Sequence, residues 1–377
     1  MLLEFGGRNF YSFKEGFQVN LRKGKEISKV LALKGSNASG KTSALKLLPF
    51  LSYFVAESFS LKDDSKIPLF SFFNNDNPVT LYVKFISNKI EYEYEVELTK
   101  DKVIHEKFYR KDIIILERNY NLIITNKIEE LDWIKDLRLK SNASIVSTLE
   151  QYGIEKIESS ELIVFLNFFT RIMSNITLYG LMEDFSNYNL VSKVYNENKK
   201  LLKFTINFLQ KVGTGIKDIT INSIYNEEKK ENIYFPVFHY DVEGKEKTLA
   251  YSEQSSGTKS LYRQLAIYKS ILDLGGILIL DELDMNLHPD LIPPLVHFFN
   301  SKKLNKNNSQ LLFTTHNTEI MDKLTKYNIV LVNKEENESY LYRLDETGEI
   351  IRNDRPISKI YNSGRLGGKP IIEIEYE

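Results

Sequence analysis

Residues 35–42 read Gly35-Ser36-Asn37-Ala38-Ser39-Gly40-Lys41-Thr42, and they are the most informative stretch of the chain. The pattern is a complete GxxxxGK[ST] loop, a motif whose backbone N–H groups wrap the phosphates of a nucleotide. In such a loop we expect Lys41 to act catalytically by neutralising the β- and γ-phosphates, and the Thr42 hydroxyl to ligate Mg²⁺. The predicted nucleotide-binding residues are Gly35, Ser36, Asn37, Ala38, Ser39, Gly40, Lys41, Thr42 and Ser43.

The segments on either side of the loop have the order that phosphate binding needs. Apolar residues at 29–33 predict a buried strand that runs into Gly35. Apolar spacing over 42–48 predicts a helix that ends near Pro49. A helix that starts directly after the loop adds its N–H groups to the anion site. The alternative interpretation is a glycine-rich turn without a ligand, and the motifs described next argue against it.

A second motif lies far along the chain, where apolar residues at 276–280 predict a buried strand that ends in Asp281 and Glu282. Burying carboxylates without a partner is costly, and Mg²⁺ is a suitable partner. We predict that Asp281 holds the ion and that Glu282 is catalytic, polarising the water that attacks the γ-phosphate. Because the two motifs are so distant in sequence, a large insertion must separate them.

Two further motifs lie between and after these. Ser255-Ser256-Gly257-Thr258 precedes a predicted helix, and small hydroxyl residues with glycine at a helix N-terminus predict a second nucleotide-binding element. The alternative interpretation is a plain serine N-cap. An apolar strand over 310–314 ends shortly before His316, which we predict to contact the γ-phosphate as a catalytic switch residue.

The wider pattern predicts an α/β fold of the P-loop NTPase class, with a mixed sheet, an antiparallel β subdomain and a helical insertion. Strict alternation at 79–85 and 90–98 predicts antiparallel strands with one solvated face. The predicted division is 1–129 as an N-lobe with the phosphate loop, 130–215 as a helical lid or arm, and 216–377 as a C-lobe with the other motifs.

Composition excludes several classes of function. The chain has 377 residues, with 50 Lys and Arg against 51 Asp and Glu, so its net charge of −1 gives no global attraction to nucleic acid or to anionic lipid. The absence of cysteine excludes disulfides, thiolate metal sites and cysteine nucleophiles. No apolar run reaches the length of a transmembrane helix, and the N-terminus does not read as a signal peptide. We therefore expect a cytoplasmic protein without a membrane partner.

The ordered motifs resemble the ABC-type ATPase heads of the SMC and OLD (overcoming lysogenization defect) group. The resemblance rests on RNFYSF at 8–13, the phosphate loop, SSGTK, ILILDELDMNLHP and TTHN. Its finer features, including YNSGRLGGKP at 361–370, are most similar to small stand-alone ATPases of bacterial anti-phage and abortive-infection systems, such as RloA, AbiL and the AriA subunit of PARIS. Residues 130–215 carry no part of the resemblance.

The resemblance implies that two ABC-type heads form a homodimer, or a higher homo-oligomer, around ATP. Each ATP would lie between the phosphate loop of one copy and the Ser255–Thr258 turn of the other, although Ser256 and Thr258 depart from the Gly and Gln usual there. It also implies a D-loop at 283–289 and a Q-loop, for which 74–77 is the suggested place. His288, just before Pro289, reads as a helix-start or interface residue rather than a metal ligand.

The function implied is an ATPase, converting ATP and water to ADP and phosphate with Mg²⁺, that regulates a separately encoded nuclease or toxin effector in anti-phage defence. The alternative is an ATPase that senses DNA ends or DNA structure in repair, with DNA as a partner. A third interpretation is an ATP-bound scaffold that does not hydrolyse. A long SMC-like tether is disfavoured because the chain has no sustained heptad repeat. A membrane-transporter subunit is disfavoured by the RNFYSF opening.

Overall fold

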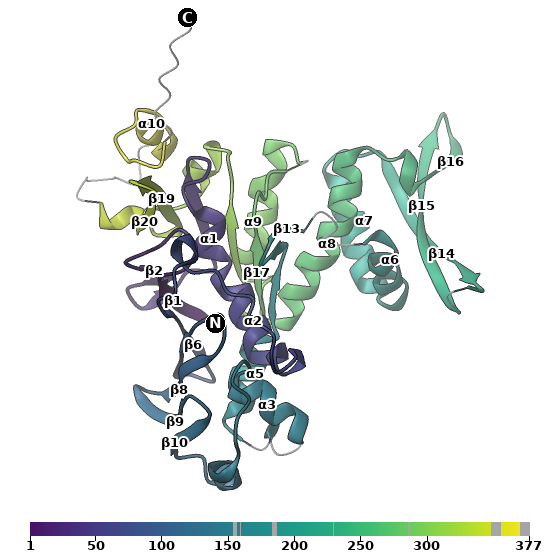
Figure 1. Cartoon of the computed structure of the whole chain (residues 1–377). Helices are drawn as coiled ribbons and strands as arrows, with labels where there is room; N and C mark the ends of the chain where they lie inside the picture. The colour runs from purple at the N-terminus through teal and green to yellow at the C-terminus, as the bar shows by residue number, and fades with distance from the viewer. Residues whose placement is uncertain are drawn as a thin grey trace, which may run out of the picture. The chain divides into compact units, whose positions relative to one another are not determined.

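The computed structural model describes residues 1–153, 157–158, 160–182, 187–228, 230–285, 287–347 and 356–369 (Figure 1). The chain divides into two compact units. The first unit comprises Met1–Leu181, Gly276–Glu282 and Asn308–Glu377, and the second comprises Met182–Gly275 and Leu283–Asn307. Within the described ranges, no helix has the length and apolar character needed to cross a membrane.

A six-stranded sheet forms the centre of the first unit, in the order β11-β17-β18-β5-β19-β20. Neighbours pair in parallel except β20, which runs antiparallel to β19. The strands are β11 (Ile172–Ser174), β17 (Ile277–Leu280), β18 (Gln310–Thr314), β5 (Val30–Gly35), β19 (Ile329–Glu335) and β20 (Glu338–Arg343). The strands predicted at 29–33, 276–280 and 310–314 are confirmed, and all three are buried along their length. Their carboxyl ends meet at one edge, where ligands bind in parallel sheets.

Two helices follow β5: α1 (Lys41–Leu45) and α2 (Leu47–Glu57). The predicted helix end near Pro49 is wrong, because Lys46 between the two helices keeps a helical backbone and Pro49 lies inside α2. Proline is tolerated there since it occupies the first turn, where its missing N–H removes little helical bonding. Apolar side chains of both helices share one core with the two large sheets of the first unit.

The second large sheet is antiparallel, in the order β10-β9-β8-β7-β6-β1-β2. Its strands are β1 (Leu2–Arg8), β2 (Phe17–Asn20), β6 (Val79–Ser87), β7 (Ile90–Leu98), β8 (Val103–Arg110), β9 (Ile113–Asn119) and β10 (Leu122–Asn126). The predicted alternation is confirmed: Tyr94 and Val96 of β7 are buried, whereas Glu93 and Glu95 lie on the more exposed face. A short hairpin, β3 (Arg22–Lys23) and β4 (Glu26–Ile27), extends from β2.

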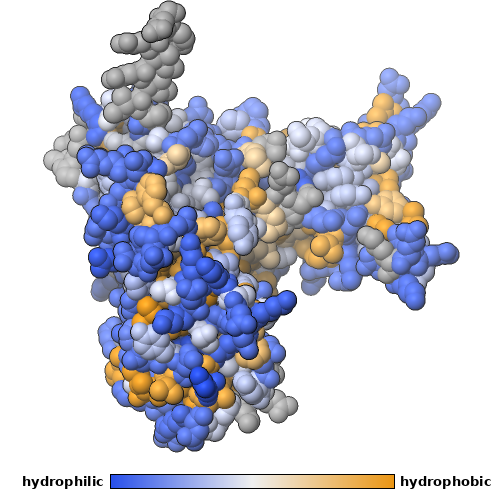
Figure 2. All heavy atoms as spheres, in the orientation of Figure 1, coloured by the Kyte–Doolittle hydropathy of each residue, from blue (hydrophilic) through white to orange (hydrophobic). Residues whose placement is uncertain are grey.

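Strand β8 was not predicted, because a charged residue occupies one of its inward positions. Glu106 is fully buried, with Arg118 of β9 at 3.4 Å and the Tyr94 hydroxyl donating to it at 2.9 Å. At the free edge of this sheet the apolar side chains of Ile113, Leu122 and Ile124 are more than half exposed. Hydrophobic surface over these strands is visible at the lower left of Figure 2.

The described helices between 130 and 215 belong to both units. In the first unit are η3 (Glu129–Asp136), α3 (Ile145–Tyr152) and α5 (Leu162–Phe169), followed by the short β12 (Ile176–Thr177) and β13 (Gly180–Leu181). In the second are α6 (Tyr188–Glu197) and α7 (Lys199–Lys211). The helices α3 and α5 pack into the main core of the first unit through Ile145, Leu149 and Phe165. The boundaries at 129 and 215 thus stay a prediction, and the contacts of the chain place a division near 182.

The second unit also holds an antiparallel sheet, β14 (Ile216–Asn226), β15 (Glu231–Val242) and β16 (Lys245–Ala250). Helix α8 (Ser256–Leu274) follows it after the turn η4 (Tyr251–Glu253), and α9 (Ile292–Asn300) follows η5 (Pro289–Leu291). The last described elements belong to the first unit: η6 (Glu319–Lys323), η7 (Lys326–Asn328), η8 (Leu344–Glu346) and α10 (Ile357–Asn362). Of these, η6 is a single five-residue 3₁₀ segment.

Candidate functional site

The glycine-rich loop leaves the carboxyl end of β5 and turns directly into α1. Ala38 and Gly40 have left-handed backbone conformations, with φ of 59° and 108°. A Cβ on Gly35 would lie 2.2 Å from the Val332 carbonyl oxygen, and one on Gly40 would lie 2.5 Å from the Ser339 hydroxyl. The loop therefore requires glycine at both positions, because the backbone packs directly on β19 and β20.

Lys41 is buried at the start of α1, and its ammonium lies over the loop. Its Nζ donates hydrogen bonds to the carbonyl oxygens of Gly35 (3.0 Å) and Ser36 (2.8 Å). Burial lowers the pKa of Lys41, and the negative charges of Asp281 and Glu282 partly oppose this shift. A desolvated cation held by two loop carbonyls can transfer its bonds to phosphate oxygens without leaving the loop.

The carboxylate of Asp281, directly after β17, accepts hydrogen bonds from Thr42, which follows β5, and from Thr314, which ends β18. Its Oδ2 accepts from the Thr42 hydroxyl at 2.7 Å, and its Oδ1 accepts from the Thr314 hydroxyl at 2.5 Å. The backbone N–H of Glu282 donates to the same Thr314 oxygen at 2.8 Å. The hydroxyl of Thr42 and the carboxylate of Asp281 are hard oxygen donors, which suit Mg²⁺.

The protein ligands for such an ion would be few. No cluster of three or more His, Cys, Asp or Glu side chains able to hold a metal occurs in the described part of the chain. A magnesium ion held by one hydroxyl and one carboxylate needs water and phosphate oxygens to complete its octahedral shell, which is the usual arrangement in nucleotide sites.

Asn175, directly after β11, was missed by the sequence analysis. Its side chain brackets the backbone of Asp281: Nδ2 donates to the Asp281 carbonyl at 2.9 Å, and Oδ1 accepts from the Asp281 N–H at 2.7 Å. Lys46 was missed as well. Burial lowers the pKa of its ammonium, and the negative charge of Asp281 partly opposes this shift. The stretch 74–77 contacts Asn9, whose side chain bonds that of Asn75 at 2.9 Å, and its assignment as a Q-loop stays a prediction.

Glu282 and His316 stand at the same sheet edge, after β17 and β18. Both side chains are exposed, and Glu282 has a left-handed backbone with φ of 51°. The backbone that carries His316 is held by Lys34 of β5, whose ammonium donates to the carbonyl oxygens of Thr315 (3.2 Å) and His316 (2.5 Å). The first unit thus brings the loop, Asp281, Glu282 and His316 to one edge.

The Ser255–Thr258 turn lies in the second unit, at the N-terminus of α8. Ser255 is the N-cap: its Oγ accepts from the Thr258 N–H at 3.2 Å and lies 3.0 Å from the Thr258 hydroxyl. Ser255 and Ser256 are exposed, and Gly257 is half-buried. The serine cap, which the sequence left as an alternative, is therefore present, and it leaves first-turn groups open to solvent.

Within the segment read as a D-loop, His288 caps η5, since its Nδ1 accepts from the Asp290 N–H at 3.3 Å ahead of Pro289. The predicted helix-start role of His288 is confirmed. Asn286 of that segment and Pro370 of the C-terminal motif lie outside the described residues.

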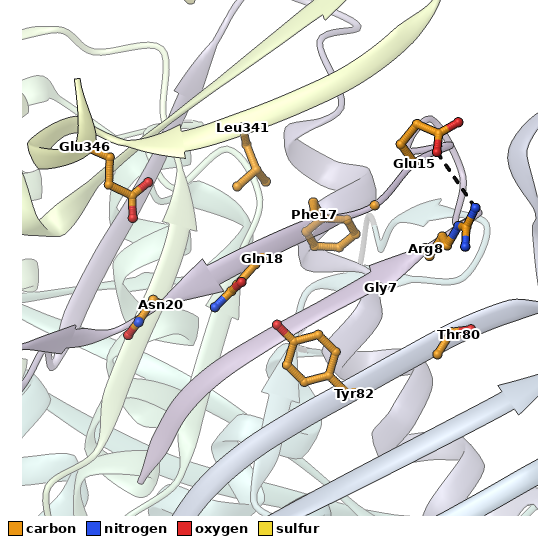
Figure 3. A pocket seen from close by; sticks show the side chains of 11 residues that line it. Gly7, Arg8, Glu15, Phe17, Gln18, Asn20, Thr80, Tyr82, Leu341 and Glu346 are labelled. Carbon is orange, nitrogen blue, oxygen red and sulfur yellow. Dashed lines mark ion pairs between the residues drawn. The ribbon is translucent and has the colours of Figure 1, made fainter. Parts of the chain in front are cut away.

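A separate hollow of about 810 Å³ lies over β1, β2 and β6 (Figure 3). Arg8, the first residue of the RNFYSF motif, and Glu15, just after the motif, form an ion pair at its rim with 3.8 Å between Nη2 and Oε2. Its other walls include Gln18, Tyr82 and Leu341. The lining contains no residue of the glycine-rich loop, so this hollow is distinct from the site around Lys41.

Comparison with solved structures identifies the fold. An SMC head bound to the C-terminal winged-helix domain of ScpA aligns with 13% identity and a TM-score of 0.52, covering 90% of this chain and 97% of that one. The SMC head domain from Thermotoga maritima aligns with 14% identity and a TM-score of 0.47, covering 91% and 98%. The first likeness confirms the predicted ABC-type P-loop head fold.

No curated protein matches the chain significantly. A family described as "AAA domain, putative AbiEii toxin, Type IV TA system" matches residues 30–322, which span the glycine-rich loop, the Ser255–Thr258 turn, Asp281, Glu282 and His316. Since the match covers well over half of the chain, the protein belongs to this AbiEii-type AAA family.

Proposed function

We propose that this protein binds ATP with Mg²⁺ and hydrolyses it to ADP and phosphate. One observation carries the proposal: Thr42 of the glycine-rich loop and Asp281 at the end of β17 are hydrogen-bonded at 2.7 Å, with Lys41 and Glu282 beside them. A hydroxyl, a carboxylate, a buried ammonium and an exposed carboxylate in this order form the set needed for phosphoryl transfer to water.

Each residue has a distinct proposed role. Residues 35–43 hold the phosphates through backbone N–H groups, and Lys41 offsets the negative charge that grows on the β- and γ-phosphates. Glu282 accepts a proton from the attacking water, whose oxygen forms the new bond to the γ-phosphorus while the bond to the bridging oxygen of ADP breaks. His316 contacts the γ-phosphate and distinguishes ATP from the products.

Thr42 and Asp281 would hold the magnesium ion. When bound there, Mg²⁺ supplies Lewis-acid stabilisation of the phosphate oxygens. Asn175 and Thr314 fix the backbone and the carboxylate of Asp281, so the ligand geometry is set before nucleotide arrives.

We further propose that ATP joins two copies of the protein. The Ser255–Thr258 turn of each copy would complete the nucleotide site of the other, using the open first turn of α8 as the second anion-binding element. Only ATP carries the γ-phosphate that the turn of the second copy would contact. ATP would therefore favour the dimer, and ADP would favour the separate copies. Exposure of Ser255 and Ser256 supports this role, because a second copy can reach them.

The biological role we propose is regulation of a separately encoded effector, a nuclease or toxin, in cytoplasmic anti-phage defence. The family match supports it, because that family is described by a toxin of a Type IV TA system. The alternative in DNA repair gains no support from the exposed face of β7, where Glu91, Glu93 and Glu95 pair with Arg22, Lys84 and Lys107, because paired charges give DNA phosphates no net attraction there.

Binding of a fluorescent ATP analogue, with and without Mg²⁺, together with phosphate release, tests the proposal. We expect Lys41→Ala to abolish binding, and Asp281→Asn to remove the Mg²⁺ dependence and to slow turnover by about a hundredfold or more. Asp101→Asn, at an exposed position of the first unit after β7, is the matched control and should behave as the wild type. Nucleotide binding that survives Lys41→Ala unchanged would overturn the proposal.

A further inference from the structure

Residues 361–369, which we name the C-terminal brace, form a glycine-rich segment of the first unit that the proposed chemistry does not use. Three hydrogen bonds fix it. The Tyr361 hydroxyl donates to the Gly368 carbonyl at 2.7 Å, and the Tyr342 hydroxyl of β20 donates to the Leu366 carbonyl at 2.6 Å. The Gly368 N–H donates to Asn333 Oδ1 of β19 at 2.5 Å. With Tyr361 and Leu366 buried, the brace is a docked part of the fold.

The brace touches the first residue of the phosphate loop. A Cβ on Gly368 would lie 3.4 Å from Tyr361 Cε2 and 3.6 Å from both Gly35 Cα and Leu331 Cδ2, so the space beside Gly35 would hold a methyl group at ordinary contact but not a branched side chain. Gly35 is itself closely surrounded, because a Cβ built on it would lie 2.2 Å from the Val332 carbonyl oxygen and 2.7 Å from the Ser39 hydroxyl. The Gly35 carbonyl oxygen also accepts a hydrogen bond from Lys41 Nζ. Any shift of Gly35 therefore moves one of the acceptors that hold the Lys41 ammonium.

The brace is also connected to the strand end that carries His316. The Tyr361 ring centroid lies 5.7 Å from Lys34 Nζ, within cation–π range. The same ammonium donates to the carbonyl oxygens of Thr315 and His316. One side chain of the brace therefore contacts, through Lys34, the backbone of the proposed γ-phosphate contact, while its hydroxyl fixes Gly368 against the loop.

We propose that the C-terminal brace is a positioning element of the nucleotide site, with Gly368 setting the place of Gly35 and Tyr361 linking the brace to the His316 strand end. Seating of the brace and binding of nucleotide then stabilise one another, and this coupling acts equally in both directions. The inference rests on the proposed ATP binding and assigns a role to the YNSGRLGGKP motif.

Glycine substitutions within the brace provide a matched pair. Gly368 and Gly364 both have left-handed backbones, with φ of 69° and 81°, so valine at either position meets the same backbone strain. A Cβ on Gly364 meets no atom within 4 Å, whereas the methyl groups of valine at 368 would press on Tyr361, Gly35 and Leu331. Any difference between the two variants therefore reports the packing of Gly368 against Tyr361, Gly35 and Leu331.

We expect Gly368→Val to weaken binding of the fluorescent ATP analogue by about tenfold or more, and Gly364→Val to change it by less than about twofold. Equal affinities of the two variants would overturn the inference. That result differs from failure of the proposed function, in which Lys41→Ala would bind as the wild type does. If Gly368→Val does not fold, Asn333→Ala, which removes the acceptor for the Gly368 N–H, takes its place with the same expected loss.

Limited trypsin digestion supplies a readout that does not depend on turnover. Arg365 is exposed between the positive-φ Gly364 and Gly367, and is an accessible cleavage position when the brace loosens. We expect ATP with Mg²⁺ to slow cleavage after Arg365 in the wild type, and to have no effect in Lys41→Ala. Cleavage at one rate with and without ATP, in a protein that binds ATP, would contradict the coupling.

Discussion

Thr42 and Asp281 share a hydrogen bond of 2.7 Å although 239 positions of sequence separate them. Thr42 is the second residue of α1, which follows β5, and Asp281 directly follows β17, with β18 between the two strands. Thr314 of that middle strand donates to the other carboxylate oxygen of Asp281, so hydroxyls of neighbouring segments hold both oxygens. The carboxylate is thus oriented by the protein itself, which is the preorganisation that metal-assisted chemistry requires.

Thr314 should affect turnover more than binding. Thr314→Val keeps the shape of the side chain but removes the bond to Asp281 and the acceptor for the Glu282 N–H. We expect turnover to fall by about tenfold or more, because the proposed general base loses its fixed place, with little change in nucleotide affinity. Steady-state phosphate release and analogue binding measure the two quantities. Thr318→Val, whose side chain makes no capping bond, is the control; an equal loss in both variants would refute this role for Thr314.

A bulky, charged side chain at the start of α8 should prevent the Ser255–Thr258 turn from completing the nucleotide site of a second copy. We expect Ser256→Arg to bind ATP as the wild type does, since the phosphate loop is untouched, but to form no ATP-dependent dimer and to lose turnover. Size-exclusion chromatography with light scattering measures the dimer. Ser223→Arg, at an exposed position of β14 in the same unit, should dimerise normally. Normal dimerisation of Ser256→Arg would show that the turn is not at the interface.

The buried pair Glu106–Arg118 should be required for stability of the first unit. Both side chains are fully buried, and Arg118 also donates to the Ala143 carbonyl at 2.6 Å. Arg118→Leu leaves a buried carboxylate without its partner, which we expect to cost about 3–5 kcal/mol in the free energy of unfolding. Urea denaturation measures it, and Arg118→Leu with Glu106→Leu should recover much of the loss.

The loss of stability in Arg118→Leu should become smaller as the pH falls. Burial raises the pKa of Glu106 above its ordinary value, and removing Arg118 takes away the charge that opposes this shift. A carboxyl with a raised pKa binds a proton more readily in the folded state, so stability increases as pH falls. We therefore expect the deficit of Arg118→Leu to be smaller in mildly acid solution than at neutral pH. A constant deficit would mean that Glu106 does not titrate in this variant.

Much of the site could be predicted from the sequence because its parts are contiguous motifs on buried strands. The loop after β5, the acids after β17 and the histidine after β18 each follow an apolar run, and parallel strands place such ends at one edge. The alternation of 79–98 likewise predicted β6 and β7, because one face of that sheet is solvated.

The parts that sequence reasoning missed lack a local signal. Strand β11 has only three residues, so nothing in the pattern marks Asn175, whose role arises from pairing with a strand that comes much later in the chain. Strand β8 contains the buried Glu106, and charge at an inward position breaks the apolar alternation. Strand β20 begins with Glu338 and Ser339 after a polar turn, and only its position beside β19 makes it a strand.

Analytical ultracentrifugation of Glu282→Gln with ATP and Mg²⁺, with phosphate release from the same sample, is the most direct test of the proposed ATPase and its dimer. Because glutamine cannot take the proton from water, turnover should fall by about a hundredfold or more. The variant should then collect as an ATP-bound dimer, while wild type returns to single copies as ADP forms. A Glu282→Gln protein that stays monomeric with ATP, or that releases phosphate at the wild-type rate, would contradict the account.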